Sequence, residues 1–376
     1  MKAKSIKGKS SSEIQTALQQ SMADGFQPTL AFVFLSVNQD RDEICKVFKD
    51  ENISIFGSTT NGEFIDEAYE TGTIAILMLD INPAYFSIQF SGLDGINDRS
   101  ITAKLATDAL KIFNNPSFFI TASSLQTDIE EMLAGFIDVI GSGINAFGGM
   151  AGDNLTFTTQ YVFTANQVGD RAVVTLIFDQ DKILMKGSAT HGWKAVGTEK
   201  TITKSTGNQL FTIENAPALD ICLKYSGLKA DIPNLAMELS MNFPLQLQRP
   251  NGDALMRPSF NVNLEDRSMI ISGKLPEGAK IRFSLPPDFD VIEDVIEQNR
   301  KFREAEMPEA DALIIYNCGG RLLCFGPLIG EEIKGMKEVW NVPMAGMFSN
   351  AEIGRTPGGN LEMHNLTTCY VVLKEK

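Results

Sequence analysis

Residues 53–63 read ISIFGSTTNGE, and this stretch decides the fold that we expect. Residues 53–58 form a short, mostly apolar run, which is typical of a strand buried on both faces. The run leads into the polar turn at 60–63. An amphipathic helix is predicted before it at 40–49, and an apolar strand before that helix at 30–37. This order of strand, helix and strand predicts a parallel strand pair in an α/β protein.

The same order recurs near the C-terminus, where residues 342–352 read VPMAGMFSNAE. A buried strand at 312–316 and a mostly helical segment at 328–340 come before it. Gly57 lies six residues before Glu63, and Gly346 lies six residues before Glu352. Similarity of element order and of spacing together indicates an internal duplication.

A looser third copy lies between these two. It has a strand at 118–121, then a helix that we expect Thr127 and Glu130 to cap, and then the segment 147–154. This segment also ends in an acidic turn, with Asp153, but the spacing from glycine to acid is shorter.

The remaining segments look antiparallel. Strands are expected at 160–165 and 172–178, which flank a hairpin signal, with a third strand at 183–189. A helix at 216–225 and short strands at 260–264, 269–273 and 280–285 follow. We therefore predict a mixed α/β fold with parallel and antiparallel sheet, divided into two domains, 1–212 and 213–376.

Composition limits the classes of function. The chain has 376 residues, is 43% hydrophobic and carries a net charge of −14. Such an acidic surface disfavours binding to nucleic acid or anionic membrane. No apolar run is long enough to cross a membrane, and the basic N-terminus lacks the apolar segment of a secretory signal. The five cysteines are expected to be reduced core thiols, so a cytoplasmic location is predicted.

The two repeated turns are the leading candidates for ligand recognition. Open α/β sheets bind ligands at the carboxyl ends of their strands, and both turns are expected there. Asn61 and Asn350 offer amide donors and acceptors, and Glu63 and Glu352 offer carboxylates suited to an ammonium or hydroxyl group. The alternative is that these residues only close turns, and both interpretations remain open at this point.

Further candidates come from the third turn and from the only two histidines. The glycine pair at 148–149 allows a ligand to approach the backbone closely, and both histidines stand beside predicted strands. The additional candidate ligand-binding residues are Gly149, Asp153, Asn154, His191, Trp193, His364 and Asn365.

Motifs of catalysis are missing from the sequence. It has no G-x-S-x-G elbow, no P-loop and no H-E-x-x-H motif, and no cysteine or histidine has zinc-ligand spacing. We therefore expect a protein that is not an enzyme and that holds no metal. The alternative of a hydrolase would place Glu63 and Glu352 as paired acids in a cleft between the domains.

Several segments taken in order resemble the FIST family of sensory proteins. Their order along the chain is that of the family's N-terminal and C-terminal domains, with Ala351 standing where the family usually has a glycine. The segments are 56–63, 147–153, 191–194 with 196–197, 216–219, 346–354 and 364–367.

The resemblance implies a prokaryotic, stand-alone sensor of signal transduction that binds a small ligand, with an amino acid or related metabolite as the proposed class. It also implies that the signal passes to a separate partner: a histidine kinase, a chemoreceptor or a cyclic-dinucleotide enzyme. One branch of the family resembles haem proteins that sense nitric oxide. That branch keeps haem as an alternative cofactor, with His191 and His364 as its axial ligands.

Overall fold

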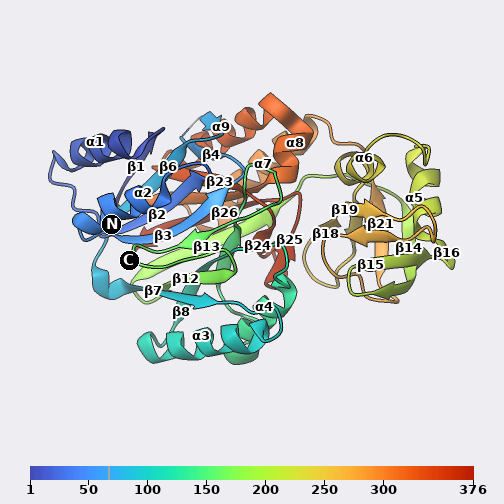
Figure 1. Ribbon diagram of the computed structural model, residues 1–376, viewed down its shortest axis with the longest axis horizontal. Coiled ribbons are helices and arrows are strands. Elements are labelled where there is room, and N and C mark those ends of the chain that lie inside the picture. The colour runs from blue at the N-terminus through green and yellow to red at the C-terminus, as the bar shows by residue number, and fades with distance from the viewer. Residues whose placement is uncertain (67) are drawn as a thin grey trace.

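The computed structural model describes residues 1–66 and 68–376. A large body built of three sheets carries the two chain ends, and a smaller lobe stands beside it (Figure 1). The body consists of three copies of one unit, so the looser third copy expected between the two similar ones is a full unit. In each copy two strands joined by a helix pair in parallel, and a third and a fourth strand add to them antiparallel.

The first unit contains β1 (Lys2–Gly8), α1 (Ser11–Met22), β2 (Leu30–Ser36), α2 (Arg41–Asp50), β3 (Ser54–Thr60) and β6 (Ile74–Asp80), with strand order β1-β6-β2-β3. The local sequence explains the connecting helix. Asp40 accepts a hydrogen bond from the amide of Glu43 and so caps α2. Ile44 and Phe48, four residues apart, then lie on one buried face of α2.

The other two units repeat this arrangement with strand orders β7-β12-β8-β9 and β13-β26-β22-β23. The second contains η1 (Pro83–Tyr85), β7 (Phe86–Gly92), α3 (Asp98–Ile112), β8 (Pro116–Ala122), α4 (Ile129–Ile140), β9 (Ala146–Met150) and β12 (Ala172–Asp179). The third contains β13 (Ile183–Thr190), α7 (Asp290–Glu306), β22 (Ala312–Cys318), α8 (Gly319–Phe325), η2 (Gly326–Leu328), α9 (Ile329–Trp340), β23 (Met344–Ser349) and β26 (Thr368–Glu375).

A cyclic exchange of hairpins joins the three units. After its acidic turn, each unit sends a short hairpin to the edge of another unit's sheet. The hairpin β4 (Glu63–Ile65) and β5 (Ala68–Glu70) extends β23, the hairpin β24 (Glu352–Gly354) and β25 (Glu362–His364) extends β9, and the hairpin β10 (Val162–Phe163) and β11 (Val168–Gly169) extends β3.

This exchange explains the repeated glycines. A Cβ on Gly57 would lie 2.3 Å from the ring of Phe163, and a Cβ on Gly346 would lie 2.3 Å from the ring of Phe64. In both places the aromatic ring belongs to the hairpin that another unit supplies. A side chain at the glycine would therefore push the exchanged hairpin away.

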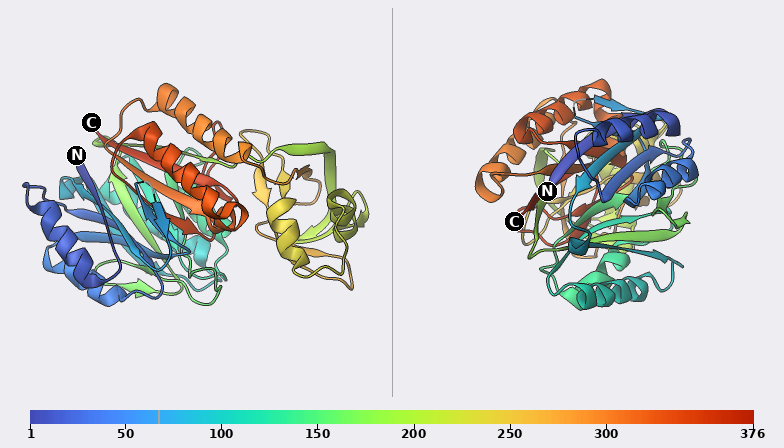
Figure 2. Two further views of the ribbon diagram at one scale, coloured as in Figure 1. Left: turned by 90° about the horizontal axis from the view of Figure 1, so that it is seen from above. Right: turned by 90° about the vertical axis from the view of Figure 1, so that its left-hand side faces the viewer.

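The main core fills the space enclosed by the three sheets, and the helices cover their outer faces. The right-hand view of Figure 2 shows helices on three sides of the strands. Inside, Phe32, Phe119 and Tyr316 come from β2, β8 and β22, one from each unit, and all are buried. Aromatic contacts link the units there, such as Phe32 with Phe119 at 5.0 Å between ring centroids.

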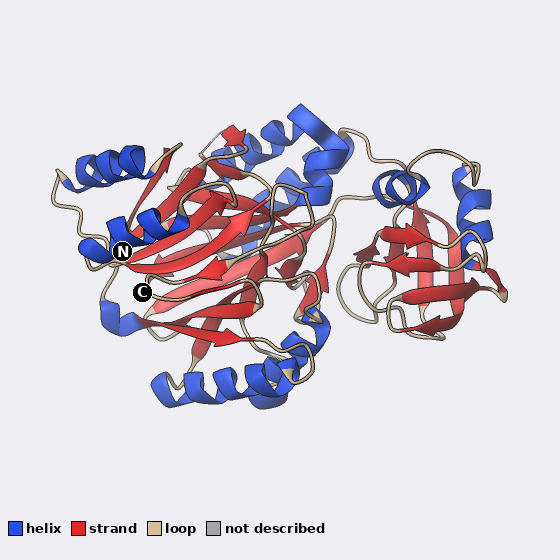
Figure 3. Ribbon diagram, in the orientation of Figure 1, coloured by secondary structure: helices blue, strands red, loops and turns tan. Residues whose placement is uncertain are grey.

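The smaller lobe is a separate arrangement of mostly short strands and helices beside the body (Figure 3). It contains β14 (Ala195–Thr206), β15 (Gln209–Ile213), β16 (Ala216–Pro217), α5 (Ala218–Ser226), α6 (Leu235–Asn242), β17 (Leu245–Leu247), β18 (Leu255–Arg257), β19 (Ser259–Val262), β20 (Met269–Ile271) and β21 (Lys280–Ser284). Its own apolar cluster holds it together. The boundary predicted at 212/213 falls within β15, because the lobe is inserted between β13 and α7 of the third unit.

The predicted mixed α/β fold is confirmed, but two details of the antiparallel part are wrong. Strand β12 pairs with β7 and β8 rather than with β10, and β13 pairs with β26 rather than with β12. The hairpin signal instead produces the short pair β10 and β11. Local turn chemistry cannot show that a strand continues into another sheet, because pairing is set by distant partners.

The helix α4 begins one residue later than predicted. Asp128, not Thr127, is its N-cap residue and accepts a hydrogen bond from the amide of Glu131. Thr127 donates to the carbonyl of Ser123 instead. Two capping patterns overlap here, Thr127 with Glu130 and Asp128 with Glu131, and the helix uses the second. Glu130 therefore has no capping role.

All five cysteines are free thiols, in agreement with the prediction of reduced cysteines. Within residues 1–66 and 68–376, no helix is both long and apolar enough to cross a membrane.

Candidate functional site

The two repeated glutamates occupy equivalent, fully buried positions. Glu352 accepts hydrogen bonds from the Oγ of Ser349 at 2.7 Å and the Oγ1 of Thr367 at 2.8 Å. Glu63 accepts from the hydroxyl of Thr60 and from Oγ1 of Thr73 at 3.0 Å. In each case one hydroxyl lies three residues before the acid and the other at the start of a later strand. Glu63 and Glu352, whose equivalence was inferred from the sequence, are thus held by the same pattern of hydrogen bonds.

Burial disfavours the ionised form of these carboxyl groups. It raises the pKa of Glu63 to about 7 and the pKa of Glu352 to about 8, although hydrogen bonds from the neighbouring hydroxyls oppose the shift. Each carboxyl is enclosed by its own turn and shares no described cavity with the other. Because each carboxyl is bonded by its own set of hydroxyl groups, this geometry favours the alternative in which the two acids close turns.

The asparagines of these turns connect the three units to one another. The Nδ2 of Asn61 donates to Oδ1 of Asn350 at 2.8 Å, and the Oδ1 of Asn61 accepts from the amides of Asp153 and Leu155 at 3.0 and 2.9 Å. The Nδ2 of Asn350 donates to the carbonyl of Ala151 at 2.8 Å. The three turns therefore meet at one end of the body, where β3, β9 and β23 finish.

The third turn closes around Asp153. This buried carboxylate accepts from the amides of Phe157 at 3.0 Å and Thr159 at 3.1 Å, and from Nε2 of Gln160 at 2.8 Å. Asn154 pairs with the hydroxyl of Ser36, so it too ties units together. These groups are fully used by the protein itself.

Gly149 is required for packing. A Cβ there would lie 2.9 Å from the ring of Tyr316 and 3.1 Å from the Cβ of Ser349. The close approach that we expected of a ligand is therefore made by side chains of the third unit.

His191 and Trp193 belong to the link between the body and the smaller lobe. The Nδ1 of His191 accepts from the amide of Trp193 at 2.9 Å, and its carbonyl accepts from Arg321 at 2.8 Å. Burial and the positive charge of Arg321 lower the pKa of His191 to about 4. Arg321 pairs with Glu332, and both are fully buried.

His364 and Asn365 lie where the third unit contacts the lobe. His364 is 1% exposed, its Nε2 faces the carbonyl of Gly354 at 3.2 Å, and burial lowers its pKa to about 3. Asn365 exchanges two hydrogen bonds with Ser272 of the lobe, at 2.9 and 3.0 Å. The ring of His364 is buried, His191 is partly exposed, and neither histidine lines the cleft or the hollow described below. Axial ligation of a haem by these histidines stays a prediction.

A cleft of about 390 Å³ lies between the body and the smaller lobe. The body contributes the loop from β8 to α4 and the turn containing Asn350 and Ala351, and the lobe contributes the stretches around Phe260 and Ser272. It is thus placed at the carboxyl ends of β8, β9 and β23, where sheets of this kind bind ligands. Of the predicted site residues, Asn350 lines this cleft.

The cleft has an apolar wall to which the body and the smaller lobe both contribute. It is formed by Leu125, Ile129, Met150, Phe260, Ile271 and Met363. Leu125 is 47% exposed and Phe260 is 61% exposed. Exposed apolar side chains at the opening of a concave site are typical of ligand pockets.

The polar part of the cleft carries charges of both signs. Lys274 pairs with Asp128 at 3.0 Å, and the amide of Lys274 donates to Oε2 of Glu130 at 3.0 Å. Arg257, 1% exposed, pairs with Glu130 at 3.2 Å. The N-terminus of α4 adds a partial positive charge. Gln126 and Asn208 also line the cleft, and their side chains make no hydrogen bond within the described part of the chain.

Sequence reasoning missed Glu130, Lys274 and Phe260 as site residues. Glu130 was assigned to helix capping, and a single lysine and a single phenylalanine in the lobe carry no motif. The only signal was the doubled capping pattern around Asp128, which leaves one acid without a capping role.

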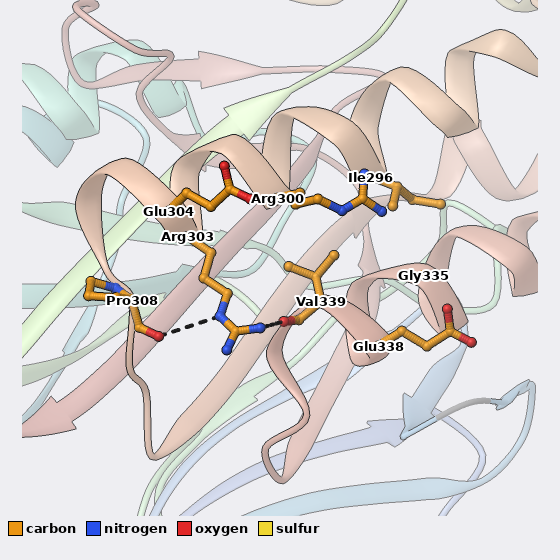
Figure 4. A pocket seen from close by; sticks show the side chains of 8 residues that line it. All are labelled: Ile296, Arg300, Arg303, Glu304, Pro308, Gly335, Glu338 and Val339. Atoms are coloured by element: carbon orange, nitrogen blue, oxygen red, sulfur yellow. Dashed lines mark hydrogen bonds between the residues drawn. The ribbon is translucent and has the colours of Figure 1, made fainter.

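A second hollow, of about 460 Å³, lies on the outer surface between α7 and α9. Figure 4 shows Arg303 reaching the carbonyl oxygens of Pro308 and Val339 across it. Arg300 pairs with Glu297 of its own helix. Since its arginines are engaged and its lining residues come from α7, α9 and Pro308, we regard the hollow as helix packing.

Comparison with known families agrees with the fold and with the order of the segments. The FIST N domain matches residues 29–216 and the FIST C domain matches residues 218–355. No curated protein matches the chain. FIST domains are associated with sensory signal transduction. The two matches together cover most of the 376 residues, and the chain belongs to the FIST family.

Proposed function

We propose that the protein is a sensor whose cleft between the body and the smaller lobe binds a small molecule, an amino acid or a related metabolite. The observation that carries the proposal is the cleft itself. It combines a suitable volume, a place at the carboxyl ends of β8, β9 and β23, and walls from both lobes.

The lining supports a ligand with a mixed character. An ammonium group would be attracted by the acids Asp128 and Glu130, and a carboxylate by Lys274 and the N-terminus of α4. The unpaired amides of Gln126 and Asn208 supply further hydrogen bonds. An apolar side chain on the ligand would lie against the apolar wall, which favours amino acids with larger apolar side chains over small polar ones.

A ligand in this position would change how the two lobes are held. The two lobes are tied by polar contacts, such as Arg257 with Glu130 and Asn365 with Ser272, and by the apolar side chain of Met256, which packs in the core of the third unit. A bound molecule that contacts both walls would favour one arrangement of the lobes, in proportion to its difference in affinity for the alternatives. A separate partner, of the kinase, chemoreceptor or cyclic-dinucleotide enzyme class, would read that arrangement.

The proposal is tested by thermal unfolding of the protein with a panel of the common amino acids and related metabolites. A ligand specific for the folded state stabilises it by ~2.7 kcal/mol at a hundred times its dissociation constant. We expect at least one apolar amino acid to raise the melting temperature of the natural protein. We expect the increase to be lost in Phe260→Ala and reduced in Lys274→Met.

The control is Arg300→Ala, which lies in the hollow on the helices. It should respond to the ligand as the natural protein does. The proposal is wrong if no compound stabilises the protein, or if a stabilising compound acts equally on Phe260→Ala and is affected by Arg300→Ala.

A further inference from the structure

Strand β7 forms an open edge of the second unit's sheet. It pairs with β12 on one side and is the last strand in the order of that sheet. The amide of Leu93 donates to the carbonyl of Arg171 at 2.9 Å, which fixes the alternation of the antiparallel ladder. By that alternation Ser87, Gln89 and Ser91 bond to β12. The backbone groups of the other residues point away from the sheet: Phe86, Ile88 and Phe90.

The equivalent edge strands of the other two units are protected. β1 carries Lys2, Lys4 and Lys7, and Lys7 pairs with Glu70 of the neighbouring hairpin. β13 carries Lys186, and the amide of its Ala189 donates to the carbonyl of Arg355 at 2.8 Å. Lysines on an edge strand and a covering loop both prevent pairing with another chain.

Within residues 1–66 and 68–376, β7 has neither a lysine of its own nor a backbone hydrogen bond from a covering loop. Its sequence, FSIQFSG, contains no charged residue and no proline. The hairpin β10 and β11, which comes from the same unit as β7, has only two residues in each strand, whereas the strands of the two equivalent hairpins have three. The side chains of Phe86, Ile88 and Phe90 are only partly buried against the core.

The adjoining helix adds exposed apolar surface at one end of the strand. Phe86 lies opposite Phe178, and Pro116 lies opposite Asp179, so β7 and β8 begin at the same end of the sheet. The C-terminus of α3 leads into β8 and therefore lies at that end. There Leu110 and Ile112 are 39% and 46% exposed.

We propose that β7 pairs antiparallel with β7 of a second copy of this chain around a two-fold axis. The pairing joins the two six-stranded sheets into one and covers the apolar end of α3. A second copy is the matching occupant because an antiparallel two-fold pair is self-complementary. The outward-facing residues alternate along β7, so each copy offers donors and acceptors to the same residues of the other. The proposal does not depend on what the cleft binds.

The first test is the molar mass in solution, measured by light scattering and sedimentation from micromolar to submillimolar concentration. We expect a dimer. A monomer throughout this range overturns the proposal.

The second test changes charge on β7. If the two-fold axis passes residue 88, position 87 faces position 89 of the other copy. If it passes residue 89, position 89 faces position 89 and position 87 faces position 91. The variant Ser87→Lys/Gln89→Lys therefore places like charges opposite each other and should raise the dissociation constant of the dimer about fivefold or more. The variant Ser87→Glu/Gln89→Glu should do the same. An equimolar mixture of the two should restore the dimer as a mixed species.

The matched control is Met237→Lys on α6, where the side chain is 46% exposed on the smaller lobe. It should leave the dimer unchanged. A dimer that withstands the charged variants of β7, or a mixture that does not recover, places the interface elsewhere and overturns the proposal.

Amide hydrogen exchange tests the same contact without a substitution. The amides of Ile88 and Phe90 should become protected as protein concentration rises, while the amide of Gln89, which bonds to β12, should be protected at every concentration. Fast exchange of Ile88 and Phe90 in a fully dimeric sample contradicts the pairing.

Discussion

The free energy of unfolding of the natural protein should fall as pH rises through the range in which Glu352 ionises. Replacing Glu352 by glutamine should abolish this part of the decrease. The carboxyl has a pKa near 4.5 when the chain is unfolded, and burial raises its pKa to about 8 in the folded state. The folded state therefore binds this proton more tightly, and the stabilisation is present below pH 4.5 and is lost as pH rises through 8. Between these values the free energy of unfolding falls by ~1.4 kcal/mol per pH unit.

Glutamine keeps the hydrogen bonds of the neutral carboxyl. Its oxygen can accept from Thr367, and its amide can donate to the hydroxyl of Ser349, which in turn can donate to the carbonyl of Asn317 at 3.2 Å. Glu352→Gln should therefore be close to neutral at pH 4.5, and its advantage over the natural protein should grow as pH rises, by about 2 kcal/mol between pH 6 and pH 8.

The measurement is urea unfolding of both proteins at pH 6, 7 and 8, followed by tryptophan fluorescence. Taking the difference between the proteins cancels the other titrating groups. Glu63→Gln provides an independent repeat, and its gain should be complete at a lower pH because the pKa of Glu63 is raised only to about 7. A difference that stays constant across the three pH values would show that the pKa of the buried carboxyl is not raised in the folded protein.

Three further substitutions test the packing of the body by urea unfolding. Asn61→Ala leaves the buried amide of Asp153 and the partly buried amide of Leu155 unpaired and should cost about 2–4 kcal/mol; a cost below 1 kcal/mol would contradict its linking role. Arg321→Met leaves Glu332 buried without its partner and should cost about 3–5 kcal/mol, whereas Arg321→Met with Glu332→Leu should recover most of it. Gly148→Ala should cost ~3 kcal/mol or more, because its Cβ would lie 1.8 Å from the carbonyl oxygen of Ile120; normal stability would show that the strands can separate there.

Local patterns in the sequence predicted the repeating unit well. The spacing of Ile44 and Phe48, the apolar strand at 30–37 and the repeated glycine and acid all correspond to observed elements and contacts. These features depend on neighbours in the chain. The exchange of hairpins between units could not be predicted, because the reason for Gly57 is a ring, Phe163, that lies far along the chain.

The site was predicted less well for the same reason. Repetition marked Glu63 and Glu352, but a repeated residue reflects the repeated fold as readily as a function, and both acids are enclosed by their own turns. The cleft is formed where the inserted lobe meets the second and third units. Its residues Glu130 and Phe260 come from segments that share no motif, so only their position in space brings them together.

We propose the cleft between the body and the smaller lobe as the ligand site. A crystal structure with the compound that most raises the melting temperature tests this most directly. We predict that the compound lies between the N-terminus of α4 and β20, in contact with Phe260 and Lys274. A compound found between α7 and α9, or against the enclosed carboxyl of Glu352, with the cleft empty would contradict the account.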